Sequence, residues 1–179
     1  MITFKASDKY EVSNPSQTAW RQGVNIRLAN DRDLNELERL NTQIAWYHHD
    51  KAPQVFVPPG QKDREYLVKN LKDPDIHIWV AEQDDRLIGF VTANIHRNTD
   101  IPFLTTVPIC WVKTIVVDEA NRSTGVGKAL LDAVASWARQ NGAREIKLQV
   151  MEFNDSAQAF YAKLGYTTQS RTMSLELDD

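Results

Sequence analysis

The residues best suited to chemistry lie in one stretch, Ile115 to Leu131, which reads IVVDEANRSTGVGKALL. An apolar β-branched run ends at Asp118, and a short polar turn then leads through Gly125 and Gly127 into an apolar helical pattern. Glycines let the backbone approach a ligand closely, and the first N–H groups of a helix lack intrahelical partners at the positive end of its dipole. A strand, a glycine loop and a helix start therefore predict a site for a phosphate.

Spacing separates this segment from two common phosphate-binding loops. A P-loop needs Gly-x4-Gly-Lys-Ser/Thr, but Arg122 stands five residues before Gly127 and Ala129 follows Lys128. A dinucleotide-binding loop needs a third glycine where this chain has Leu130. What remains is Arg-x-x-Gly-x-Gly after a hydrophobic strand, for which an ordinary strand-to-helix turn is the alternative interpretation.

A second patterned segment, Asn154 to Tyr166, reads NDSAQAFYAKLGY. Its apolar residues follow helical spacing, Asn154 suits the N-cap, and Gly165 suits a left-handed helix end. In this order, the two segments resemble the acetyl-CoA loop and the Asn-x-x-Ala-x-x-Phe-Tyr-x-x-x-Gly-Phe/Tyr motif of the GCN5-related N-acetyltransferase (GNAT) superfamily. The resemblance covers the chain from Val24 to its C-terminus.

This resemblance implies direct attack of a primary amine on the thioester of acetyl-CoA, the acetyl donor. In the family, the strand before the loop bulges and separates from the next strand, so its backbone groups bind the pantetheine arm and the thioester carbonyl. The loop would hold the pyrophosphate, mostly through N–H groups, with charge added by Arg122 and Lys128. The coenzyme-binding residues implied are Ile115, Val116, Val117, Arg122, Ser123, Thr124, Gly125, Val126, Gly127, Lys128, Asn154 and Tyr161.

Tyr161 is the residue that the resemblance assigns as general acid for the departing thiolate. A thiol of pKa ~8.5 and a tyrosine of pKa ~10 make this proton transfer uphill by about 2 kcal/mol. A tyrosine buried in the core would give the same helical pattern. For the general base, Trp111 stands where several family members carry a glutamate, so no residue is carried over. The candidates are Glu82, His96 and Glu152, or a chain of water molecules.

The acceptor amine is expected to bind near the end of the first helix, where the family sets its specificity. Trp46, Tyr47, His49 and Asp50 are the candidates, since aromatic faces and a carboxylate can hold a cation. A metal site is not expected, because the adjacent His48 and His49 point to different faces of a helix and no H-E-x-x-H is present.

Three functions fit these residues. The first is acetylation of a small amine or an amino-acid-like acceptor. The second is acetylation of a protein N-terminus or lysine, which needs an open groove. The third is a non-catalytic acyl-CoA-binding or sensing module, which the missing glutamate at Trp111 makes an alternative.

The remaining pattern predicts the elements that position these residues. Alternating or continuous apolar runs predict strands over 24–28, 76–82, 87–95, 109–117, 145–150 and 172–177. Helical spacing predicts a helix from Asp31 toward Trp46, one over 63–71, one from the glycine loop to Asn141, and one around Tyr161. With the resemblance, this order predicts an α/β (α+β) GNAT fold, a mixed and mostly antiparallel sheet of six or seven strands with about four helices on both faces.

Composition sets the class and the compartment. The 179 residues, 42% hydrophobic and 25% charged, suit one domain over 24–179 preceded by an arm or extension over 1–23. A net charge of −3 without a basic block gives no sign of a nucleic acid partner, and no segment suits a membrane span. The only cysteine, Cys110, falls in a buried strand pattern, where packing is expected, and fits a reducing compartment. We expect a cytoplasmic protein, with a homodimer possible by analogy of fold.

Overall fold

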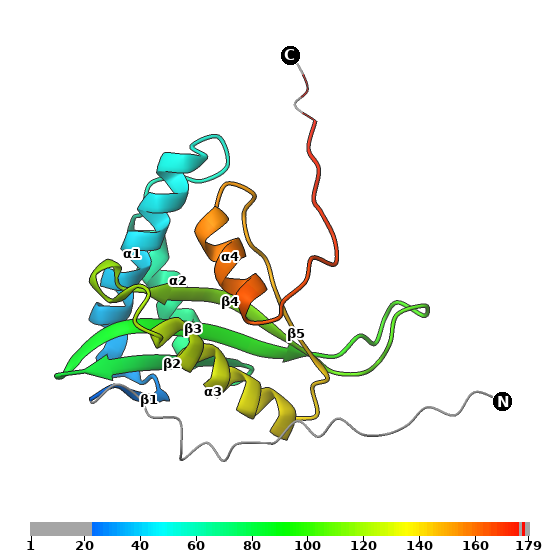
Figure 1. Ribbon diagram of the computed structural model, residues 1–179, viewed down its shortest axis with the longest axis horizontal. Coiled ribbons are helices and arrows are strands. Elements are labelled where there is room, and N and C mark those ends of the chain that lie inside the picture. Colours follow the sequence, from blue (N-terminus) through cyan, green and yellow to red (C-terminus); the bar gives the residue numbers. More distant parts are fainter. Residues whose placement is uncertain (1–22, 176, 178–179) are drawn as a thin grey trace.

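A five-stranded sheet in the order β1-β2-β3-β4-β5 forms the centre of the computed structural model, which describes residues 23–175 and 177 (Figure 1). Neighbouring strands are antiparallel except β4 and β5, which are parallel. In chain order the elements are β1 (Asn25–Leu28), a 3-10 turn (Asp31–Asp33), α1 (Leu34–Lys51), α2 (Gln61–Lys72), β2 (Ile76–Gln83), β3 (Arg86–His96), β4 (Ile109–Val117), a second 3-10 turn (Glu119–Asn121), α3 (Val126–Gln140), β5 (Glu145–Leu148) and α4 (Asp155–Lys163).

Helices cover both faces of the sheet. Alternation along β3 sends Phe90 toward a core cluster with Leu37 of α1, and Val91 toward a second cluster with Leu130 of α3. Cys110 lies fully buried in the second cluster, and burial raises its thiol pKa to about 11. The predicted mixed sheet with helices on both faces is therefore confirmed, and Cys110 packs in the core as expected.

Among the described residues the sheet has five strands, fewer than the six or seven predicted. The segment 172–177 alternates like a strand, but its described residues, 172–175 and 177, form none. Met173, Leu175 and Leu177 are 93%, 84% and 85% exposed. Alternation does not make a strand unless a neighbouring edge completes the ladder of hydrogen bonds, and this segment has no such neighbour within the described chain. The strand β5 also ends at Leu148, short of the predicted residue 150, and the predicted arm 1–23 lies outside the described residues except Gly23.

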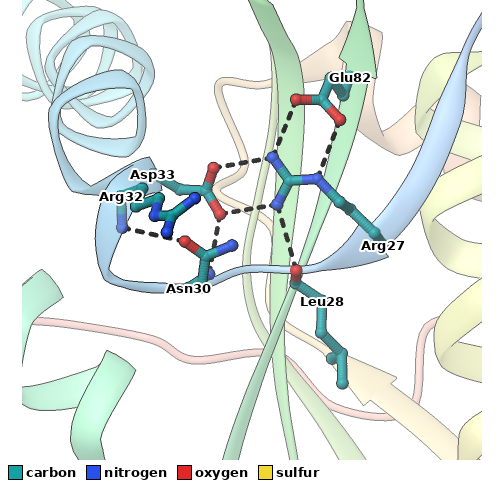
Figure 2. A network of polar contacts seen from close by, with 6 residues as sticks. All are labelled: Arg27, Leu28, Asn30, Arg32, Asp33 and Glu82. Carbon is teal, nitrogen blue, oxygen red and sulfur yellow. Dashed lines mark hydrogen bonds and ion pairs between the residues drawn. The ribbon is translucent and has the colours of Figure 1, made fainter. Parts of the chain in front are cut away.

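An ion network joins the first strand to the first helical segment (Figure 2). The guanidinium of Arg27 donates to both carboxylate oxygens of Asp33, at 2.8 and 2.9 Å, and to both of Glu82, at 2.9 and 3.0 Å. Asp33 also accepts from the backbone N–H of Asn30, whose side chain caps the 3-10 turn. Hydrogen bonds from Arg27 hold the pKa of Asp33 below its usual range.

We expect Asp33→Asn to lower the free energy of unfolding at pH 7 by about 2 kcal/mol, because it leaves a partly buried guanidinium short of one carboxylate. The folded-state pKa of Asp33 is depressed, so its contribution is present above an unfolded pKa of about 3.9 and is lost as the pH falls through the folded value. Urea unfolding at neutral and at acidic pH measures this. If Asp33→Asn lowers the free energy of unfolding by the same amount at both pH values, the ion pair with Arg27 is not the source of the loss.

Candidate functional site

The strand β4 is irregular on the side of β3 and loses its other neighbour, β5, part-way along its length. Thr92 pairs with Thr114 and Ala93 with Val112, so Lys113 is an extra residue, a β-bulge. On the other side, β5 pairs only with Ile109–Val112. Beyond Val112 the two strands separate, and the edge of β4 that faced β5 is left without a strand partner.

A cavity of about 240 Å³ lies at this point of separation, which we call the fork. Trp111, Val112 and Lys113 line it from β4, and Gln149 lines it from the residue that follows β5. The Lys113 ammonium lies 5.8 Å from the centre of the Trp111 ring. The cavity therefore adjoins both the bulge and the open edge of β4.

The glycine loop begins α3 directly after β4. Gly125 is the N-cap residue with φ +96°, a left-handed conformation that favours glycine, and no side chain caps the helix there. A Cβ on Gly125 would meet no atom within 4 Å, so the space before the helix start is open. This open space adjoins the first turn of α3, at the positive end of the helix dipole, which suits an anion.

The two basic residues of the loop already have acidic neighbours. Arg122 lies 3.3 Å from Glu119, and Lys128 lies 2.6 Å from Asp132. Both pairs are exposed, so each contributes little to stability and can be exchanged for another anion. The fold therefore holds the backbone N–H groups in place, whereas the side chains of Arg122 and Lys128 can turn toward a bound anion.

An ion pair that the sequence pattern does not show fixes the start of this loop. Arg39 of α1 donates to Asp118 at 2.6 Å and to the carbonyl oxygen of Leu87 at 2.7 Å. Asp118 in turn accepts from the N–H of Ala120, and hydrogen bonding to Arg39 helps to hold its pKa below the usual range against the opposing effect of burial. Because Arg39 is 79 residues from Asp118, only the folded chain brings them together.

Gly127 lies where α3 meets α4. A Cβ at this position would be 3.1 Å from Phe160 Cζ, closer than ordinary contact. We expect Gly127→Ala to lower the free energy of unfolding by about 1 kcal/mol through this overpacking. In the Gly127→Ala/Phe160→Leu double variant, the smaller side chain should restore part of the loss. Denaturant unfolding of the four proteins in this cycle measures the coupling, and strictly additive losses would contradict the contact.

The fourth helix presents the two residues expected from its motif. Asn154 Oδ1 accepts from the N–H of Ala157 at 3.2 Å, so Asn154 caps α4. Tyr161 is 9% exposed and belongs to the same core cluster as Val112 and Leu148, the last paired residues before the fork. Burial, with a smaller effect of Tyr166, raises the pKa of Tyr161 to about 12. The hydroxyl therefore stays protonated at neutral pH, but it is a weaker acid than a free tyrosine.

Aromatic side chains join the end of α1 to two loops. Tyr47 and His48 lie 6.0 and 5.7 Å, between ring centres, from Phe153, which follows β5 in the loop that leaves the fork at Gln149. His49 Nδ1 lies 2.8 Å from the carbonyl oxygen of Phe56. The sequence-predicted residues Trp46 and Asp50 are exposed at this same helix end. The structure thus adds Phe153, whose contact with α1 no local pattern predicts.

The sequence profile of the Acetyltransferase (GNAT) family matches residues 34–166. The chain belongs to this family. The GNAT chain is 29% identical to a mycothiol acetyltransferase from Segniliparus rotundus over 85% of its own length, but it spans only 55% of that relative. It is 27% identical to an aminoglycoside N(6′)-acetyltransferase type 1 from Salmonella typhimurium, over 84% of this chain and 96% of the relative.

Solved structures agree with this assignment. An aminoglycoside N-acetyltransferase in complex with CoA has 25% identity and a TM-score of 0.66, covering 86% of this chain and 94% of that one. A protein from Bacillus halodurans, at 24% identity, has a TM-score of 0.81 over 86% of this chain and 99% of its own, which shows the shared fold. The predicted GNAT fold is therefore confirmed.

The three base candidates of this GNAT chain lie in different places. Glu82 is bound to Arg27 two strands away from β4, and hydrogen bonds from Arg27 lower its pKa, which makes it a poorer proton acceptor. His96 pairs with Ile109, at the end of β4 where β5 is still attached. Glu152 is exposed in the loop that leaves the fork. Of the three, Glu152 alone lies in the segment that follows β5.

Two features are absent from residues 23–175 and 177. Nowhere in this part of the chain do three histidine, cysteine, aspartate or glutamate side chains gather as a metal site would require. Within the same residues, no helix combines the length and the apolar character needed to cross a membrane.

Proposed function

We propose that this GNAT protein is an acetyl-CoA-dependent N-acetyltransferase that acts by direct attack of an acceptor's primary amine on the coenzyme thioester. The observation that carries the proposal is the arrangement on β4. Its bulge at Lys113 and its open edge beyond Val112 provide a place for the thioester arm, and the same strand leads into the anion-binding start of α3. One coenzyme molecule can therefore span both features.

Acetyl-CoA supplies the acetyl thioester, and main-chain groups of the protein would hold it. The N–H and C=O groups of Ile115 and Val117, on either side of Val116, would bind the pantetheine arm, and one N–H would stabilise the oxyanion. The N–H groups from Ser123 to Lys128 would bind the pyrophosphate, with Arg122 and Lys128 exchanging their present acidic partners for it. The cap residue Asn154 would contact the coenzyme from the start of α4.

Proton transfers would be made by two side chains, Glu152 and Tyr161. The amine nitrogen loses a proton as the new N–C bond forms, and Glu152, exposed in the segment that follows β5, is the candidate base, directly or through water. When the C–S bond breaks, the protonated hydroxyl of Tyr161 would donate to the thiolate. Because burial raises the pKa of Tyr161 to about 12, full transfer to a thiol of pKa ~8.5 is uphill by about 5 kcal/mol.

The acceptor would be the amine of a small or amino-acid-like molecule held at the end of α1. Trp46, Tyr47 and His49 offer aromatic faces there, and Asp50 offers a carboxylate for a cationic group. Relatives named for mycothiol and for aminoglycosides support a small acceptor. As the compartment we propose the cytoplasm, since the single cysteine cannot form an intrachain disulfide.

A coenzyme-binding module without catalysis is the second candidate, because Trp111 replaces the glutamate that resemblance would lead one to expect. Thermal unfolding with and without acetyl-CoA, followed by thiol release with a panel of amines, tests both functions. Acetyl-CoA at a hundred times its dissociation constant should add about 2.7 kcal/mol of stability. Thiol release with a small amine would support the enzyme. Stabilisation without thiol release would favour the module or a protein acceptor, and no stabilisation would refute both.

A further inference from the structure

The charge that lines the fork cavity is positive. The lining residues are Trp111, Val112, Lys113 and Gln149, and of these Lys113 alone carries a charge. Its exposed ammonium lies 5.8 Å from the centre of the Trp111 ring. Within residues 23–175 and 177, Lys113 forms no ion pair, whereas the loop cations Arg122 and Lys128 each have an acidic partner. The cavity therefore offers a cation whose charge no neighbouring carboxylate offsets.

This cation lies on the face of the sheet that α1 covers. Trp111 pairs with Asn94, and Asn94 pairs with Ile76, which packs against the core cluster beneath α1. Directly paired residues on neighbouring strands share a face, so the Trp111 ring and the Lys113 ammonium beside it lie on the α1 side. Tyr161 belongs to the core cluster on the other face. The general acid and the cation are thus on opposite sides of β4.

The proposed acceptor site at the end of α1 lies on the same side as the cation. Phe153 follows Gln149 in the segment after β5, and its ring centre is 6.0 Å from that of Tyr47 on α1. The segment that lines the fork cavity therefore also contacts the end of α1. An acceptor held there reaches the open edge of β4 from the side on which Lys113 lies.

We propose that Lys113 selects an acceptor whose primary amine stands close to a carboxylate, as in an α-amino acid. This inference rests on the proposed acetyl transfer and names the acceptor class for it. The carboxylate gains a charge-assisted hydrogen bond from the Lys113 ammonium, and the amine beside it is then held at the open edge of β4. An acceptor with several positive charges and no anionic group places like charge against Lys113 and is disfavoured.

Paired acceptors test this proposal on the full chain. Each member of a panel of α-amino acids is compared with its own carboxamide, which keeps the side chain and lacks the carboxylate charge. The carboxamide has the less basic amine, so a preference for the acid does not come from a larger fraction of free amine. In thiol release with acetyl-CoA, we expect the acid of the preferred pair to have a kcat/KM at least ~10-fold higher than its carboxamide.

Two substitutions and a matched control assign this preference to Lys113. Lys113→Met should remove the preference for the acid, and Lys113→Glu should reverse it in favour of the carboxamide. The control is Lys147→Met, because Lys147 pairs with Trp111 from β5 but lies 3.3 Å from Glu145 and does not line the cavity. This control should keep the wild-type preference. Equal losses for acid and carboxamide in Lys113→Met would mean that Lys113 acts on the coenzyme, which would overturn the proposal.

Calorimetric titration of the same pairs into the CoA-saturated protein measures selection without turnover. The acid of the preferred pair should bind at least ~10-fold more tightly than its carboxamide, and Lys113→Met should abolish the difference. Selective binding without thiol release from any amine would refute the proposed acetyl transfer and support the selection by Lys113. Thiol release with acid and carboxamide alike, or with uncharged amines alone, would support the transfer and overturn the selection. The selection is also overturned if no acid of the panel binds or reacts.

Discussion

Tyr161→Phe is expected to lower kcat about 100-fold while the affinity for acetyl-CoA stays within about twofold, because only the proton donor is removed. The ring keeps its packing in the core cluster to which Val112 also belongs, so the coenzyme site should keep its shape. An effect at the lower end of the range for general acids is expected, since a pKa of about 12 makes Tyr161 a weak acid. Steady-state thiol release and calorimetric titration with acetyl-CoA measure the two quantities separately.

The matched control is Tyr166→Phe. Its ring centre lies 5.7 Å from that of Tyr161, and burial raises its pKa too, but it lies after α4 rather than on it. We expect this control to retain its turnover. Unchanged turnover in Tyr161→Phe, or equal losses in the two variants, would contradict the role of Tyr161.

The raised pKa of Tyr161 also predicts two effects of alkaline pH. The hydroxyl remains protonated up to about pH 11, so its ionisation should not reduce turnover between about pH 8 and pH 10. The folded-state pKa lies above the unfolded value of about 10, so the stability that Tyr161 contributes is present below that value and is lost as the pH rises toward 12. Tyr161→Phe should therefore lose less stability than the wild type over this interval, as followed by thermal unfolding.

Local patterns were sufficient for the parts of the site that depend on neighbouring residues. The helix start at Gly125, the cap at Asn154 and the continuous apolar run of β3 each follow from a few consecutive residues, and the structure has all three. Backbone conformation and capping are decided within one turn of chain, which is why sequence alone predicts them.

The rest depends on contacts between distant residues. The anchoring of Asp118 by Arg39 and the contact of Tyr47 with Phe153 join segments that only the complete fold brings together. The bulge at Lys113 depends on the register between two strands, which periodicity does not give. Burial of Tyr161 is a tertiary property too, and it raises the cost of proton transfer above the value expected for a free side chain.

A bulky residue at Gly125 should weaken acetyl-CoA binding at least ~100-fold. In Gly125→Val, the side chain enters the open space before α3 and separates the pyrophosphate from the N–H groups there. Losing two hydrogen bonds to a charged group, at about 1.5–3 kcal/mol each, corresponds to this change in affinity. The left-handed φ of +96° adds strain of about 1–2 kcal/mol, which a folded domain of this size can tolerate.

The matched control is Gly142→Val, which introduces similar backbone strain without blocking the anion site. Gly142 has φ +79°, also has open space around it, and follows the opposite end of α3. Both variants should therefore lose similar stability in thermal unfolding, while calorimetric titration should show weakened coenzyme binding for Gly125→Val alone. Equal affinity losses would mean that helix stability controls binding, and unchanged affinity in Gly125→Val would place the phosphates elsewhere. Only a loss confined to Gly125 makes the start of α3 the pyrophosphate site.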